Sequence, residues 1–278
     1  MTTFQVIIDS ILRVISGIIP FSYEWANQIA EHFLQFKAKP ELDYLVTLIL
    51  CIVFFAYFRF DWLGLFSALI RTLTQPTSLK KENRTLDQEV LIFLSAISVP
   101  VAILRSFVSP MISENESLQS PLLFGGLFFI AAGLLRFSYR WNKRIKGLNH
   151  LRTLDSVPII LVSILSIHPA FPLPLVFWVG LAITNYHYEA VFKYSMLLMG
   201  VQTLVHFFHL TGNVGFAMAM DAVGRLNGVA ALVVMFSIAW WMIMENLQKT
   251  LGENTFKSYQ WFNIFAALGS FAFHFLKG

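Results

Sequence analysis

The sequence predicts an all-α integral membrane protein with about six transmembrane helices and two re-entrant helical hairpins. Of its 278 residues, 56% are hydrophobic and only 13% are charged, whereas a soluble domain carries about a quarter charged residues. The mean hydropathy is +0.65, and the apolar residues form runs long enough to cross a bilayer as helices. A soluble domain, a disordered chain and a disulfide-stabilised scaffold are excluded, because the chain is apolar and has a single cysteine, Cys51.

Six stretches have the length and the apolar content of membrane spans. A helix needs about 20 largely apolar residues to cross the hydrocarbon core. The stretches that meet this condition are residues 42–60, 88–110, 121–138, 190–210, 222–246 and 257–276.

Two further apolar regions are interrupted by proline, and we expect each to form a re-entrant hairpin. Residues 4–36 are broken by Gly17 and Pro20, and residues 153–185 contain four prolines. Proline ends or kinks a helix, and broken backbone persists inside a bilayer only where protein or a water-filled cavity satisfies it. The alternative of ordinary kinked spans is less favoured for the second region, where three prolines fall within six residues.

The charged loops predict how the chain is oriented in the membrane. Residues 139–152 contain five basic residues and no acid, and residues 71–87 contain four basic and two acidic residues. Residues 111–120 contain Glu114 and Glu116 and no basic residue. The positive-inside rule places the first two loops in the cytoplasm and the third outside, and both termini are then expected on the outer side. The net charge of +4 therefore indicates topology and no nucleic-acid partner.

The order of these elements predicts an inverted-topology repeat within one membrane domain, residues 1–278. The first repeat, residues 1–138, contains the hairpin at 4–36, and the second, residues 139–278, contains the hairpin at 153–185. The two hairpins are expected to open toward opposite sides. In such proteins, broken helices meet near the middle of the membrane and form a substrate site.

Three short segments carry a similarity to a known family. Residues 11–21 read ILRVISGIIPF, residues 194–198 read YSMLL, and residues 256–260 read FKSYQ. In order and spacing they resemble the "ILGxxxGxxEF", "FSFLL" and "FxxYR" segments of the BacA-type undecaprenyl-diphosphatase family. The resemblance extends over nearly the whole chain. It implies a protein of the bacterial inner membrane, similar to enzymes that recycle the polyprenyl lipid carrier, with six spans and two re-entrant hairpins.

The resemblance also implies two catalytic motifs, and both are degenerate in this chain. The acidic positions of the first motif fall on Ser16 and Pro20. The second motif, Pro-Gly-x-Ser-Arg-Ser-Gly, reads PAFPLPL here: its arginine falls on Leu173 and its serines on Pro172 and Pro174. Hydrolysis of a diphosphate needs cations and a positioned base or nucleophile. We therefore expect no catalytic residue, no cofactor and no metal, and the loss of the hydrolytic activity.

Ionisable side chains inside apolar segments are costly in free energy and indicate functional sites. Five such residues are candidates for binding the phosphate of a lipid: Arg13, Glu24, Arg105, His168 and Arg225.

Each candidate also has a structural interpretation. Arg13 can pair with Asp9, and Arg225 with Asp221, because each pair is four residues apart on a helix. Glu24 can cap a helix, and a lone histidine is more often a hydrogen-bonded structural group. Two further histidines, at 206 and 209, have no third ligand nearby, so a metal site is not expected.

Three functions follow from these observations, in decreasing order of preference. The first is a non-catalytic protein that binds or translocates polyprenyl phosphate or diphosphate. The second is a structural or assembly subunit whose partner is another membrane protein or a second copy of the chain. The third is an active diphosphatase that uses relocated residues, namely Arg13, Glu24 and His168.

Overall fold

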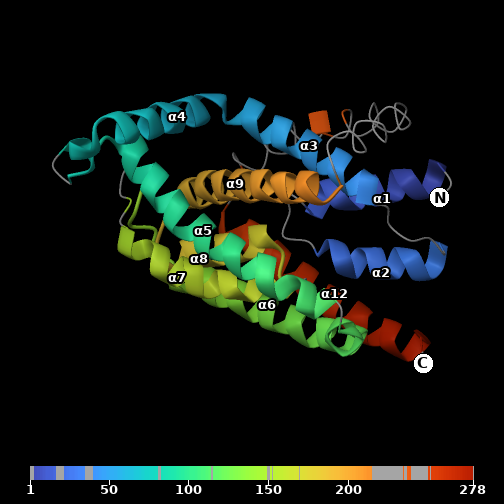
Figure 1. Cartoon of the computed structure of the whole chain (residues 1–278). Helices are drawn as coiled ribbons and strands as arrows, with labels where there is room; N and C mark the ends of the chain where they lie inside the picture. Colours follow the sequence, from blue (N-terminus) through green and yellow to red (C-terminus); the bar gives the residue numbers. More distant parts are fainter. Residues whose placement is uncertain are drawn as a thin grey trace.

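The structure is a computed structural model in which every regular element is a helix. It describes residues 3–16, 22–34, 40–80, 83–113, 115–148, 151, 153–168, 170–214, 234, 237–238, 250 and 252–277. Within these ranges there is no strand, and the only β-type pairing is an isolated bridge between Lys146 and Tyr186. Figure 1 shows the helices packed side by side as an elongated bundle. The expected all-α class is therefore confirmed.

Three helices in the described part of the chain are long and apolar enough to cross a membrane. They are α5 (Leu86–Ser113), α6 (Pro121–Trp141) and α9 (Tyr188–Val214), and their qualifying segments are Leu86–Arg105, Pro121–Trp141 and Tyr188–Gly212. These segments coincide with the expected spans at 88–110, 121–138 and 190–210. Helices of spanning length are therefore confirmed at these three places.

The expected span at 42–60 is replaced by a bent pair of helices. Helix α3 (Pro40–Tyr57) is followed by α4 (Arg59–Thr74) at an angle of 87°. The bend is fixed by Trp62, whose Nε1 donates to the carbonyl oxygen of Phe54 at 3.3 Å and whose ring stacks on Phe55. In addition, Asp61 forms an ion pair with Lys193 of α9 at 2.6 Å. Together the two helices have the length and apolar content of a span, so the pair is either one broken span or a re-entrant loop.

The last helix, α12 (Glu253–Lys277), covers the expected span at 257–276. It packs along α6, where Tyr139 donates a hydrogen bond to Gln260 at 3.0 Å. The polar side chains of Asn263 and Ser270 are buried and bond to carbonyl oxygens one turn earlier. These polar groups make α12 less apolar than the three candidate spans. The remaining expected span, at 222–246, lies outside the described residues except for 234, 237 and 238.

Both predicted hairpins form antiparallel helix pairs. In the first, Gln5 of α1 (Thr3–Ser16) donates to the carbonyl oxygen of Leu34 at the end of α2 (Tyr23–Leu34) at 2.9 Å. In the second, α7 (Ser156–Ser163) and the 3₁₀ turn η5 (Ile164–Ile167) lead into α8 (Leu173–Ile183). Gly180 of α8 lies directly against Ile159 of α7. Their re-entry into a membrane, and the repeat that relates them, stay predictions.

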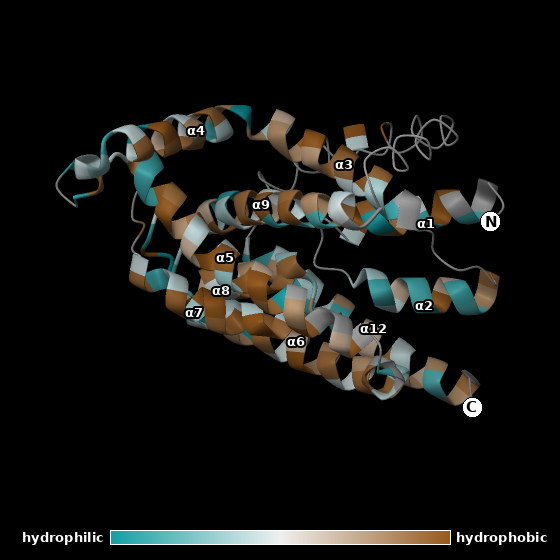
Figure 2. Cartoon of the chain, in the orientation of Figure 1, coloured by the Kyte–Doolittle hydropathy of each residue, from teal (hydrophilic) through white to brown (hydrophobic). Residues whose placement is uncertain are grey.

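Helix α8 forms the core of the bundle. Its residues from Pro174 to Ala182 are buried on every side of the helix, and they contact α6, α7 and α9. A helix that is apolar all around is stable only when other elements enclose it. Figure 2 shows the brown, hydrophobic colour concentrated on α6, α7 and α8, whereas α2 is mainly hydrophilic.

The two ends of the bundle differ in what they contain. Figure 1 shows both termini at one end, together with the connection between α5 and α6. The connections that carry the basic residues, between α4 and α5 and between α6 and α7, lie at the opposite end. Which end faces which side of a membrane stays a prediction.

We expect the substitution Gly180→Ala to destabilise the α7–α8 pair. A Cβ atom at this position would lie 3.0 Å from the Cα atom of Ile159, a backbone atom that cannot move aside without shifting α7. Overpacking of this kind costs about 1–3 kcal/mol. The matched control is Gly126→Ala in α6, where a Cβ would meet no atom within 4 Å. Thermal unfolding of the full chain in detergent should show a lower Tm for the first variant only; equal Tm values would contradict this packing.

Candidate functional site

Arg13 is the centre of a group of ionisable side chains on the first hairpin. Helix α1 places Asp9 and Arg13 one turn apart, and the Arg13 Nε donates to Asp9 Oδ1 at 3.2 Å. The Nη1 atom of Arg13 donates to Oδ1 of Asp43, at the beginning of α3, at 2.5 Å. The pairing expected between Arg13 and Asp9 is therefore present, and a second carboxylate connects α1 to α3.

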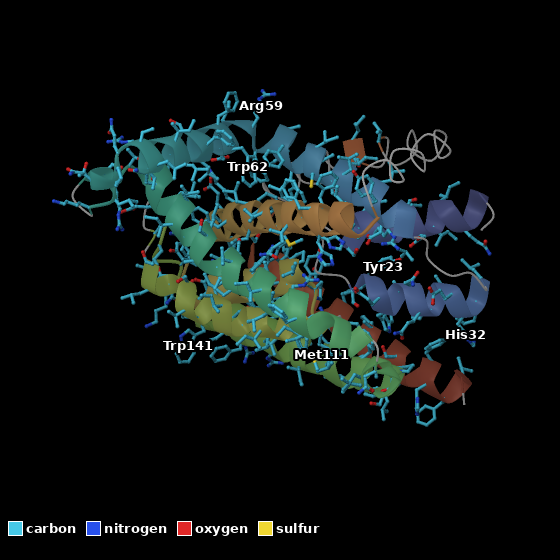
Figure 3. The ribbon with its side chains drawn as sticks, viewed as in Figure 1. Tyr23, His32, Arg59, Trp62, Met111 and Trp141 are labelled. Carbon is cyan, nitrogen blue, oxygen red and sulfur yellow. The ribbon has the colours of Figure 1, made fainter. Side chains whose placement is uncertain are left out.

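Tyr23 connects the second helix of the hairpin to the same group. Its hydroxyl donates to Asp9 Oδ1 at 2.7 Å, and the Arg13 guanidinium lies 4.4 Å from the centre of its ring. Figure 3 labels Tyr23 at the beginning of α2, beside α1. Asp9 is fully buried, and its Oδ2 atom has no hydrogen-bond partner among the described residues. The hairpin thus contains a carboxylate that is only half satisfied by its surroundings.

Helix α9 contributes His206, whose Nε2 lies 3.4 Å from Asp43 Oδ2. Asp43 therefore lies between a guanidinium and an imidazole that come from two different helices. Asp43 was not predicted from the sequence, because an acid at the edge of a predicted span is typical of an ordinary helix start. From the sequence, His206 is expected to be an interfacial histidine, and its contact with Asp43 was not expected.

Glu24 and Arg105 form the second part of the site. Ser22 Oγ accepts from the backbone N–H of Trp25 at 3.2 Å, so Ser22 occupies the capping role that was considered for Glu24. The Glu24 side chain is exposed and interacts electrostatically with Arg105 of α5 and with Arg13. Arg105 is the last residue of the qualifying segment of α5. Among the described residues its guanidinium has no hydrogen bond and no ion pair within 4 Å.

These side chains, which we name the ionisable cluster, are unbalanced in charge. The cluster consists of Asp9, Arg13, Glu24, Asp43, Arg105 and His206. Three carboxylates are matched by two guanidiniums, so the cluster carries one net negative charge while the imidazole is neutral. Unbalanced charge is costly in an apolar environment, so the cluster is an unusual concentration of charge in a largely apolar bundle.

His168, at the tip of the second hairpin, does not contact the cluster in the described structure. Its Nε2 lies 2.9 Å from the carbonyl oxygen of Leu118, and its Nδ1 accepts from the backbone N–H of Ala170 at 3.1 Å. Burial lowers the pKa of His168, which favours the neutral ring that this pair of hydrogen bonds requires. Its ring also meets Phe124 edge-on. The contacts fit the structural interpretation, because the histidine fixes the hairpin tip to the connection between α5 and α6.

The degenerate motif positions are occupied by packing groups. Phe171 is only 2% exposed, Leu173 packs against the core and Pro174 is buried. Pro172 has extended backbone immediately before α8. Ser16 donates its hydroxyl to a carbonyl oxygen one turn earlier in α1. The tip of the second hairpin is therefore apolar and filled.

Two of the residues that the sequence singled out have no described position in the structure. Pro20 and Arg225 both lie outside the described residues. The candidates that the structure brings together are Arg13, Glu24 and Arg105, with Asp43 and His206 as additions.

No family model matches the chain, and no curated protein sequence matches it. The resemblance to the BacA-type family stays a prediction.

We expect the substitution Arg13→Met to destabilise the protein strongly. It leaves the fully buried Asp9 and the partly buried Asp43 without their shared cation, and removing one partner of a buried ion pair costs about 3–5 kcal/mol. A lower Tm of the full chain in detergent would measure this effect. The control is Arg59→Met, which removes an exposed arginine stacked on Phe60.

A second variant tests whether charge imbalance is the cause. Combining Arg13→Met with Asp9→Leu removes the buried carboxylate together with the cation, and it should recover part of the lost stability. If Arg13→Met unfolds at the same temperature as the parent chain, the ion pairs do not stabilise the hairpin.

Proposed function

We propose that this chain binds the phosphate group of a polyprenyl carrier lipid at the ionisable cluster and does not hydrolyse it. We further propose that the protein has six spans and two re-entrant hairpins in an inverted repeat. It would lie in the bacterial inner membrane with both termini on the outer side. The paired antiparallel hairpins and the opposite placement of the basic connections support this arrangement.

The proposal rests on the hydrogen-bond donors of Arg105, which have no partner among the described residues. A guanidinium presents five N–H donors in a planar fork that fits phosphate oxygens. In the described structure those donors are unused at the end of an apolar span, and Glu24 acts on Arg105 only electrostatically, without an ion pair within 4 Å. An anionic head group between α2 and α5 would fill these donors.

Several features argue against hydrolysis. The positions where the resembled family places its arginine and serines hold Pro172, Leu173 and Pro174, and these pack within or beside the core. A relocated catalytic set would need His168 beside Arg13 and Glu24, but both nitrogens of His168 are engaged at the other hairpin. We therefore rank an active diphosphatase last.

A structural or assembly subunit is a second candidate function. It is favoured by the tip of the second hairpin, where Phe171 and Leu173 fill the space that a ligand would need. The partner would be another membrane protein or a second copy of the chain. Co-purification of a stoichiometric partner from the native membrane would support this function, and a monomer that binds the carrier lipid would oppose it.

The substitution Arg105→Gln should weaken binding of undecaprenyl phosphate by roughly tenfold or more. Hydrogen bonds to a charged group contribute about 1.5–3 kcal/mol, and the amide cannot replace the guanidinium charge. Native mass spectrometry of the full chain in mild detergent would measure the bound fraction at increasing lipid concentrations. Arg105→Lys should recover binding in part, and Arg59→Gln should bind like the parent chain.

Two results would overturn the proposal. One is unchanged lipid binding by Arg105→Gln. The other is release of phosphate from undecaprenyl diphosphate by the parent chain, which would restore the enzymatic interpretation.

A further inference from the structure

The outer face of α6 contains a groove near the end of the helix. It is lined by Gly133, Arg136, Phe137, Arg140 and Trp141 and has a volume of about 390 Å³. Their spacing places all five on one stripe of the helix, and all five are exposed. Figure 3 shows Trp141 at the outer edge of the bundle, away from the end that holds the termini. We name this feature the α6 groove.

The α6 groove faces away from the rest of the protein. The opposite side of α6 is buried against α12 and α8 through residues that include Ala131, Leu135 and Tyr139. The groove occupies the last turns of the candidate span Pro121–Trp141. In a membrane this stripe would contact lipid where the hydrocarbon core meets the head groups.

Two positive charges in the groove have no counter-charge in the described part of the chain. Arg136 and Arg140 lie four residues apart, and like charges at this spacing repel. Neither forms a hydrogen bond or an ion pair with any residue in the described part of the chain. By contrast, the nearby Arg144 is paired with Glu253 at 3.0 Å. A charged side chain on a lipid-facing surface is costly unless it reaches an anionic group at the interface.

The rest of the groove is apolar and open. The rings of Phe137 and Trp141 stack 5.2 Å apart and are 46% and 58% exposed. Aromatic side chains of this kind are enriched where a protein crosses the membrane–water interface. Gly133 leaves the deeper part of the groove open, because a Cβ there would meet no atom within 4 Å. The groove therefore combines a cationic outer part with an apolar inner part, as a phospholipid requires.

We propose that the α6 groove binds an anionic phospholipid of the leaflet that adjoins the basic loops. The phosphodiester lies between Arg136 and Arg140, whose guanidiniums match phosphate oxygens, and an acyl chain lies along Gly133 and Phe137. Basic pockets at this depth are suited to anionic head groups. A second copy of the chain is a poorer occupant, because a symmetric contact would bring the same two arginines together. The proposal does not depend on the ionisable cluster.

The test uses the full chain in mild detergent, titrated with phosphatidylglycerol or phosphatidylcholine and observed by native mass spectrometry. The double variant R136Q/R140Q should bind phosphatidylglycerol roughly tenfold more weakly than the parent chain and should bind phosphatidylcholine equally. The matched control R71Q/K80Q removes the same charge from two other exposed residues and should bind both lipids like the parent chain.

A second pair of variants tests the shape of the groove without changing its charge. Gly133→Leu would fill the inner part and should weaken binding of phosphatidylglycerol several-fold. Gly126→Leu, on the same helix and also with open space beside it, should have no effect.

Three results would overturn the proposal. Unchanged phosphatidylglycerol binding by R136Q/R140Q would show that these arginines do not hold the lipid. An equal loss of affinity in R71Q/K80Q would show that binding depends on overall charge and not on the groove. A parent chain that is dimeric in detergent and becomes monomeric with Gly133→Leu would identify the groove as a contact between copies. None of these results would change the expected behaviour of Arg105→Gln toward undecaprenyl phosphate.

Discussion

The cost of placing charge in an apolar environment governs the arrangement of this protein. Arg13 meets this cost by bridging Asp9 and Asp43, which fixes the first hairpin against α3. Asp43 extends the same network to His206 on α9. The helices that surround the site are therefore connected by ion pairs as well as by apolar contacts.

The two hairpins differ in how they handle the cost of charge in an apolar environment. The first collects ionisable side chains, and its α2 is the most hydrophilic helix of the bundle (Figure 2). The second has none in α7 or α8, and α8 is enclosed on every side. His168 at its tip is neutral and fully hydrogen-bonded. The hairpins thus have similar helical form and different chemistry: one presents charge to the region between helices, and the other fills the core.

Much of the fold could be predicted because apolar length is a local property of the chain. The spans at 121–138 and 190–210 and the two proline-interrupted hairpins were expected from sequence and are present as helices. The bend at Phe58 was missed, because it depends on contacts of Trp62 and Asp61 with residues that no local pattern identifies. Likewise, the pairing of Arg13 with Asp9 was expected from its four-residue spacing, whereas the pairing with Asp43 was not.

The amino-acid sequence alone predicted an all-helical chain with helices apolar enough to cross a membrane, and it determined the scarcity of charge at the second hairpin. These conclusions require only hydropathy, proline and residue spacing. The tertiary structure decided which of the scarce charges meet. It placed Asp43 between Arg13 and His206, and it brought Arg105 within electrostatic range of Glu24. It bonded His168 to another part of the chain, and among the described residues it left Arg136 and Arg140 without counter-charges. The physical reason is that electrostatic energy depends on distances between helices, and residues far apart in sequence acquire those distances only when the helices pack.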